Sequence, residues 1–338
     1  MSKSKVLYIL FITLLYGGLN FNCNSQVANN NTEKERLSLV SKIILPNISG
    51  RIDHITYDPV NHLAFIAALG NNTVEVVDLN TKQPVKTITG LHEPQGIVYI
   101  PSLKKLVVAN GDNGDCIFYD AVTYKQSGIV HLKGDADNIR YDAISDLVYV
   151  GYGGGGIATI DAKSMKQAND ISLDEHPESF QLSKKQNRIY INVPGANEIE
   201  VAELSTNKVI AKWKNTSASS NFPMALDEIN NRVFIGCRSP AKLRMVNAET
   251  GKDISMVNCS GDADDVFYNG SDSLVFVSAG RGFIDVFRAH EKELVQINHI
   301  KTRSGARTSL LLESEKKFLL AVPAHAGNPA ALWIYNVE

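Results

Sequence analysis

RIDHITYD at residues 51–58 begins a pattern that returns six more times along the chain. The other copies are EPQGIVYI (93–100), DADNIRYD (135–142), HPESFQLS (176–183), SNFPMALD (220–227), DADDVFYN (262–269) and ARTSLLLE (306–313). Successive copies start 42, 42, 41, 44, 42 and 44 residues apart. A period in the forties with strand-like content is typical of a β-propeller, in which each repeat forms one blade. The sequence therefore predicts seven blades.

Each period contains the pattern of four antiparallel strands. In the first repeat, apolar and polar residues alternate over 55–57, and β-rich runs follow at 63–67, 74–77 and 85–88, separated by turn-forming residues. The later repeats keep this order. No stretch of useful length after the N-terminal segment has helical periodicity.

The seventh repeat ends at Glu338 after its third strand. Residues 37–46 (LSLVSKIILP), which precede the first repeat, have the pattern of the fourth strand that this blade lacks. We therefore predict an all-β fold over residues 37–338, a seven-bladed propeller whose ring is closed by strand 37–46 joining the last blade. Closure by hydrogen bonds leaves no radial sheet edge exposed.

The first 25 residues have the pattern of an export signal. Two lysines precede an eleven-residue apolar run at 6–16, which is too short to span a hydrocarbon core of ~30 Å. Small residues at Cys23 and Ser25 favour cleavage after Ser25, which makes 1–25 a signal peptide; acylation of Cys23 as a lipid anchor is the alternative. Both routes predict an exported protein, periplasmic, secreted or on the cell surface. Residues 26–36 are polar and predict a flexible linker.

Charge and cysteine content bear on two questions, namely whether the chain binds nucleic acid and whether it forms disulfides. The net charge is −2, and lysines and arginines are scattered among the acids, so the chain lacks the basic stripe that nucleic-acid binding needs. Of the three cysteines after the signal, Cys237 and Cys259 are expected on strands separated by a third strand. That separation of about 9–10 Å exceeds the reach of a disulfide, so we predict free thiols.

Runs such as FIAA (65–68), VVAN (107–110) and FVSA (276–279) resemble the YVTN repeat. Over residues 37–338 the chain is similar to the YncE-like seven-bladed β-propellers. This resemblance implies the propeller fold and a location in the bacterial periplasm or at the cell surface. Most members of that family have no assigned activity, and the resemblance implies no catalytic residue.

The first four positions of the repeats are polar more often than packing requires, and their residue types change from blade to blade. We expect them at one mouth of the central channel, where such a mixture suits an asymmetric ligand. The candidate ligand-binding residues are Arg51, Asp53, His54, Glu93, Gln95, Asp137, Asn138, His176, Glu178, Asn221, Asp264, Asp265 and Arg307. The structural alternative is that these side chains cap loops or bond the next blade.

Carboxylates are concentrated among these positions. Eight are expected to converge on the mouth, namely Asp53, Glu93, Asp135, Asp137, Glu178, Asp262, Asp264 and Asp265. Like charges at close range repel by on the order of several kcal/mol, so the cluster must bind protons, pair with arginines or hold a cation. Oxygen ligands suit Ca²⁺, and a histidine among them suits a transition metal. The candidate metal ligands are Asp53, Glu178 and Asp264.

Two classes of function fit this pattern. The first is a non-catalytic binding or scaffold protein whose channel mouth takes a small molecule, a glycan or a partner protein. The second is a divalent-metal-dependent lactonase or other hydrolase that uses the same residues, with His54 or His176 carrying the proton. No GxSxG, HExxH or CxxCH motif occurs. The glycines at 153–156 predict a hairpin turn rather than a phosphate cradle.

Overall fold

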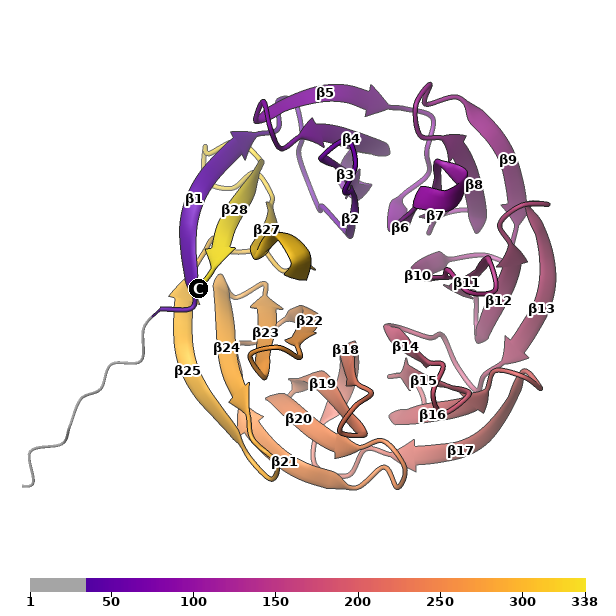
Figure 1. Ribbon diagram of the computed structural model, residues 1–338, viewed down its shortest axis with the longest axis vertical. Helices are drawn as coiled ribbons and strands as arrows, with labels where there is room; N and C mark the ends of the chain where they lie inside the picture. Colours follow the sequence, from indigo (N-terminus) through magenta and orange to yellow (C-terminus); the bar gives the residue numbers. More distant parts are fainter. Residues whose placement is uncertain (1–34) are drawn as a thin grey trace, which may run out of the picture. The chain divides into compact units, whose positions relative to one another are not determined.

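The computed structural model describes residues 35–338, and this part of the chain forms a ring of seven four-stranded antiparallel sheets (Figure 1). The predicted seven-bladed β-propeller is confirmed. Within the described range the only helical segments are three short 3₁₀ turns, η1 (Leu69–Asn71), η2 (Pro101–Leu103) and η3 (Glu313–Glu315). None of these could cross a membrane. The expected signal peptide, the anchor at Cys23 and nearly all of the linker lie outside the described residues.

The first four blades follow one another along the chain, and each runs from the channel outward (Figure 1). Their strands are β2 (Ile55–Asp58), β3 (Leu63–Ala68), β4 (Thr73–Asp78) and β5 (Gln83–Ile88); β6 (Pro94–Ile100), β7 (Lys105–Asn110), β8 (Asp115–Asp120) and β9 (Gln126–His131); β10 (Ala136–Asp142), β11 (Leu147–Tyr152), β12 (Gly156–Asp161) and β13 (Lys166–Ser172); and β14 (Phe180–Ser183), β15 (Arg188–Val193), β16 (Glu198–Glu203) and β17 (Lys208–Lys214).

The last blade combines both ends of the described chain. The fifth and sixth blades contain β18 (Ser219–Asp227), β19 (Arg232–Ser239), β20 (Ala241–Asn247) and β21 (Asp253–Asn258), then β22 (Ala263–Asn269), β23 (Leu274–Ala279), β24 (Phe283–Ala289) and β25 (Leu294–Lys301). The seventh contains β26 (Ser309–Leu312), β27 (Lys317–Val322), β28 (Ala331–Val337) and β1 (Leu37–Ile44). β1 pairs antiparallel with β28, from Leu37 opposite Val337 to Ile44 opposite Ala331. The predicted closure is therefore confirmed.

Seven apolar cores hold the ring together, and each lies between two neighbouring sheets. One core, for example, joins Phe65 of the first blade to Leu106 of the second, both fully buried. The second and third strands of a blade are apolar on both faces, because both faces pack against other sheets about 10 Å away. The fourth strands are largely exposed and polar, as in β13. Cys116, Cys237 and Cys259 are free, as predicted.

The chain turns sharply as it enters four of the seven inner strands. Glu93, Asp135, Ser220 and Asp262, each the first residue of its repeat, have positive φ angles. Side chains with a Cβ rarely adopt this conformation, and it is concentrated at turns and functional sites. These turns direct the next residues of the repeat toward the channel.

Candidate functional site

The channel opens at one face into a cavity of about 640 Å³. Loops that enter the inner strands meet there with turns that join the second and third strands. Its lining consists of Arg51, Leu69, Glu93, Gln95, Gly111, Asp112, Asp135, Asp137, His176, Glu178, Phe222, Arg238, Asp264 and Arg307. Six of these side chains are carboxylic acids and three are arginines, so the cavity has an excess of acid.

Arginines paired with carboxylates occupy one part of this mouth. The guanidinium of Arg51 lies 2.7 Å from the carboxylate of Asp53, which is 1% exposed. Arg238 and Arg307 both contact Asp264, and Arg307 Nε lies 2.7 Å from Asp264 Oδ2. These groups, which we call the arginine side, are Arg51, Arg238, Arg307, Asp53, Asp262 and Asp264.

Three further contacts fix the arginine side. Arg307 Nη1 donates to Asp262 Oδ1 at 2.9 Å. Arg238 donates from Nε to the Ala263 carbonyl at 2.9 Å, and its guanidinium lies 3.7 Å from the centre of the Phe222 ring. Stacking of this kind holds a guanidinium against an aromatic face. Each arginine of this side therefore has a carboxylate partner, and Arg238 and Arg307 are also held by a second contact.

The opposite part of the mouth has acids without an arginine. His176 Nε2 lies 3.8 Å from Asp135 Oδ2 and 4.0 Å from Asp137 Oδ2. Asp135 accepts a hydrogen bond from the Gln95 amide at 3.0 Å. Within residues 35–338, no group makes a hydrogen bond or ion pair with the Glu178 carboxyl. We call Asp135, Asp137, His176 and Glu178 the acid side.

On the acid side, protonation of Glu178 and His176, rather than an arginine, offsets the negative charge. Burial raises the pKa of Glu178 to about 8, and the nearby carboxylates of Asp137 and Asp264 add to the rise. Burial acts to lower the pKa of His176, but Asp137, the Gly153 carbonyl and Asp135 outweigh it and raise the value to about 9. Excess negative charge in a partly buried space favours the protonated form of both groups.

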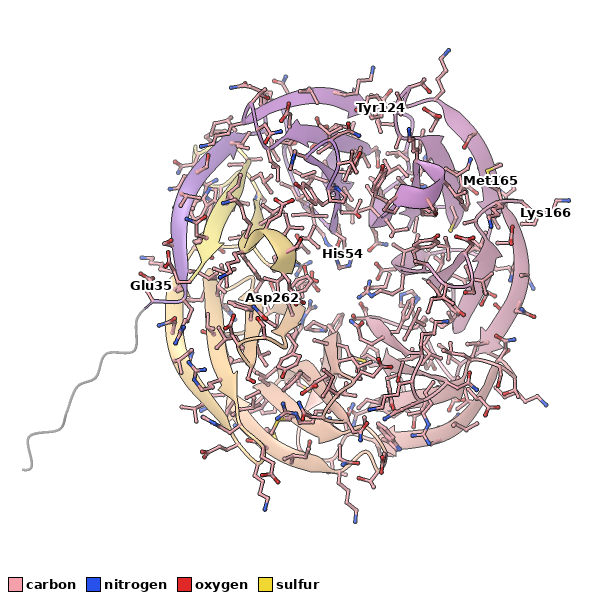
Figure 2. All side chains as sticks on the ribbon, in the orientation of Figure 1. Glu35, His54, Tyr124, Met165, Lys166 and Asp262 are labelled. Atoms are coloured by element: carbon pink, nitrogen blue, oxygen red, sulfur yellow. The ribbon has the colours of Figure 1, made fainter. Side chains whose placement is uncertain are left out.

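Below the mouth, His54 lies between two buried carboxylates. Its Nε2 lies 3.6 Å from Asp53 Oδ1 and its Nδ1 lies 3.7 Å from Asp265 Oδ1. Figure 2 shows His54 at the inner edge of the ring, facing the central opening. Burial raises the pKa of Asp265 to about 7, although its carboxylate accepts the Ser309 N–H at 2.6 Å.

A second cavity of about 340 Å³ lies along the inner strands, lined by His54, Asp265, Arg140 and mainly apolar residues. Arg140 donates to the Ile139 carbonyl at 2.8 Å and to Ser179 Oγ at 3.2 Å. Among the described residues no carboxylate lies within 4.0 Å of its guanidinium. The channel thus has a charged mouth and a narrower, more apolar lower part.

The structure brings most of the expected site residues into these two spaces. Eight of them line the mouth, namely Arg51, Glu93, Gln95, Asp137, His176, Glu178, Asp264 and Arg307. His54 and Asp265 line the lower cavity, and Asp53 lies beneath Arg51. Asn138 and Asn221 line neither cavity. Asn221 is fully buried and donates to Asn192 and to the Glu198 carbonyl, which corresponds to the structural alternative.

Several lining residues were not among the candidates. Arg238 and Asp112 lie outside the repeated octets, since Arg238 is in β19 and Asp112 is in the turn after β7, so octet comparison alone does not find them. Phe222 and Arg140 do lie in octets. Arg140 is the only charged residue at the sixth octet position, where the other copies have polar or apolar residues. That departure from the repeat is the sequence signal that could have identified Arg140 as a channel residue.

Comparison with known proteins supports the fold. No family model matches the chain. A chain in the crystal structure of the mitotic checkpoint complex is similar with a TM-score of 0.75 and 12% identity, covering 96% of this chain and 100% of that one. Hydrazine synthase of Kuenenia stuttgartiensis is similar with a TM-score of 0.74 and 13% identity, covering 86% of this chain and 97% of that one. At these identities the likeness shows the fold alone, and the expected YncE-like family stays a prediction.

Proposed function

We propose that this protein is an exported binding module that takes up a small, positively charged solute at the mouth of its channel. The observation that carries the proposal is the Glu178 carboxyl. It lines the cavity beside Asp137, and within residues 35–338 no cationic side chain pairs with it. The three arginines of the mouth are engaged by Asp53, Asp262 and Asp264.

A bound cation would displace the protons that otherwise offset the negative charge of the acid side. Carboxylates that share a partly buried site are stabilised by an opposite charge within about 4–6 Å. The cavity of about 640 Å³ falls in the range of small-molecule sites. Its two unlike sides would orient a solute with its positive group toward Glu178 and its other polar groups toward the arginine side.

Thermal melting with a panel of ions tests this function. The probes are putrescine and choline as organic cations, Zn²⁺, Mn²⁺ and Ca²⁺ as metal ions, and sulfate as an anion. We expect at least one cation to raise the melting temperature by several degrees at saturation, since a ligand at a hundred times its Kd stabilises by about 2.7 kcal/mol. Sulfate should produce no comparable shift.

Matched variants locate the binding. Asp137→Asn combined with Glu178→Gln should abolish the shift, whereas Asp174→Asn, which removes a carboxylate outside both cavities, should keep it. Absence of a shift with every cation, or an unchanged shift in the double variant, would overturn the proposal.

A metal-dependent hydrolase is the second candidate function. The observation in its favour is an imidazole, His176, beside two carboxylates in a cavity wide enough for a substrate. Hydrolysis of p-nitrophenyl acetate or γ-butyrolactone by the metal-loaded protein, and its loss in His176→Ala, would support this candidate. Binding of a cation without turnover of either ester leaves the binding module as the function.

A further inference from the structure

We propose that the solute cation is a divalent transition metal ion held by Asp137, His176 and Glu178. This inference rests on the proposed function, since it names the cation that the mouth takes. One ligand atom from each of the three side chains can be chosen so that all lie within 4.8 Å of one another. A metal ion placed among them would be in reach of all three after small side-chain rotations.

Two neighbouring blades supply the three groups. Asp137 is the second residue of β10, the inner strand of the third blade, while His176 and Glu178 lie in the loop that leads into β14 of the fourth. Their octets are adjacent around the ring, so the closed propeller fixes the separation of the two loops. The site thus combines one residue of an inner strand with two residues of the neighbouring blade's loop, and does not depend on a single loop.

The orientation of His176 is set by a backbone carbonyl. His176 Nδ1 lies 2.6 Å from the Gly153 oxygen. Because a carbonyl oxygen only accepts, Nδ1 is the donor, and Nε2 is the nitrogen that faces the carboxylates. Histidines that bind metals are held in this way by a hydrogen bond from the other ring nitrogen.

The glycine hairpin after β11 makes this contact available. Gly153 has a φ of +57°, and a Cβ there would lie 2.6 Å from the Lys133 carbonyl oxygen. Only glycine fits this position without displacement of the backbone. The glycine-rich stretch at 153–156 therefore has a specific role, which is to bring a carbonyl group to His176.

Asp137 supplies an independent indication of a ligand. It is 7% exposed, yet none of the described residues donates a hydrogen bond to its carboxylate. The nearest positive group is His176 Nε2 at 4.0 Å, which is too far for a hydrogen bond. Because Asp137 lines the cavity and has only this long contact with His176, its carboxylate is available to a partner that enters from outside.

The donor set favours a transition metal over Ca²⁺ or Mg²⁺. Calcium takes six to eight oxygen ligands, and magnesium retains several waters. One imidazole and two carboxylates match the ligands of Zn²⁺ and Mn²⁺, and three protein ligands leave a coordination position open. That position would be available to water or to a donor group of a second bound molecule.

A second cluster of acids, Asp174, Glu198 and Glu200, has similar spacing but is already neutralised. Lys212 Nζ lies 2.5 Å from Asp174 Oδ2, and Lys214 Nζ lies 2.8 Å from Glu198 Oε2. A metal ion would have to displace both lysines. This cluster therefore serves as the control for the first.

Calorimetric titration of the full protein, treated with chelator and then dialysed, tests the metal site. We expect one equivalent of Zn²⁺ to bind at least 100-fold more tightly than Ca²⁺. His176→Ala and Asp137→Asn should each weaken Zn²⁺ by at least 100-fold, while Asp174→Asn should leave it unchanged. In Co²⁺-loaded protein, visible absorption bands should shift in His176→Ala, a signature that a purely structural role would not produce.

The outcomes separate this inference from the proposed function. Loss of Zn²⁺ binding in Asp174→Asn but not in His176→Ala would overturn the assignment of the site. Binding of putrescine or choline with no saturable binding of Zn²⁺ or Mn²⁺ would overturn the metal and leave the binding module intact. Failure of all cations would overturn both. Thermal melting of each variant in the absence of metal verifies that it is folded.

Discussion

The arginine side and the acid side of the mouth are built from the same repeated octet, yet they handle charge in opposite ways. On the arginine side each carboxylate lies against a guanidinium, as Asp264 does against Arg307 at 2.7 Å. On the acid side the only cationic group within 4.0 Å of Asp137 is His176, and among the described residues no cationic side chain lies that close to Glu178. The first arrangement is complete without a ligand, and the second is not.

Under the proposed function, this difference indicates which side of the mouth a cation would bind. Ion pairs on the arginine side fix loop positions. A solute that displaced them would have to break these pairs, and the free energy lost would offset the free energy of its own contacts. On the acid side, protons on Glu178 and His176 offset the negative charge, and an incoming cation would displace them. Perturbed acids of this kind are concentrated at functional sites.

Neutralising Asp264 should have the largest effect on stability. Asp264→Asn leaves the guanidiniums of Arg238 and Arg307 close together without their shared carboxylate. Breaking a largely buried pair in this way destabilises by about 3 kcal/mol. Urea denaturation at pH 7 measures the loss. Glu178→Gln is the matched change on the acid side, where no ion pair exists to break; because it removes an acid whose pKa is raised, it should leave stability at pH 7 unchanged or increase it. Equal losses in the two variants would contradict the distinction between the sides.

Asp265 extends the comparison below the mouth, because it is a buried acid with a histidine but no close arginine. His54 lies on one side of it, the Ser309 N–H binds it, and Arg140 and Asp264 act from farther away. Its pKa of about 7 exceeds the ordinary value of 3.8, so the folded state holds this proton more tightly than the unfolded state does. Stability from this group is therefore present at low pH and is lost as the pH rises from about 4 to 7.

Asp265→Asn should remove that pH dependence. The shift alone corresponds to on the order of 4 kcal/mol, and we expect about 2 kcal/mol because His54 loses one of its two carboxylates. Relative to the wild type, the variant should gain stability steadily between pH 4.5 and 7.5 in urea denaturation. Parallel profiles for the two proteins would show that Asp265 is ionised throughout this range.

The fold was predictable because its information is repeated. The octets, their spacing and the strand at 37–46 each predict the same ring, and β1 pairs with β28 as expected. The second and third strands have apolar residues on both faces because both faces pack against neighbouring blades. One repeat alone would not have identified the fold, whereas seven copies at a regular spacing predict a seven-bladed propeller.

The site was only partly predictable, because pairing depends on which loops meet in space. Position in the octet correctly predicted that Arg51, Asp137, His176 and Glu178 line one cavity. It could not predict which acids would have an arginine partner. Asn138 and Asn221 have the same octet signal, yet both are buried away from the two cavities. Arg238 neutralises Asp264 from a different repeat element, and short sequence patterns carry no information about that contact.

Phe222 offers the finest test of the arginine side. Its ring lies against Arg238 at 3.7 Å, so Phe222→Leu should reduce stability by about 0.5–1 kcal/mol through loss of the cation–π contact. Some of that change comes from packing alone. A double-mutant cycle with Arg238→Met isolates the coupling between the two side chains, and we expect about 0.5 kcal/mol from urea denaturation. Cation affinity at the acid side should stay the same in Phe222→Leu, because neither side chain contacts Asp137, His176 or Glu178. A coupling near zero would mean that Asp264 alone positions Arg238.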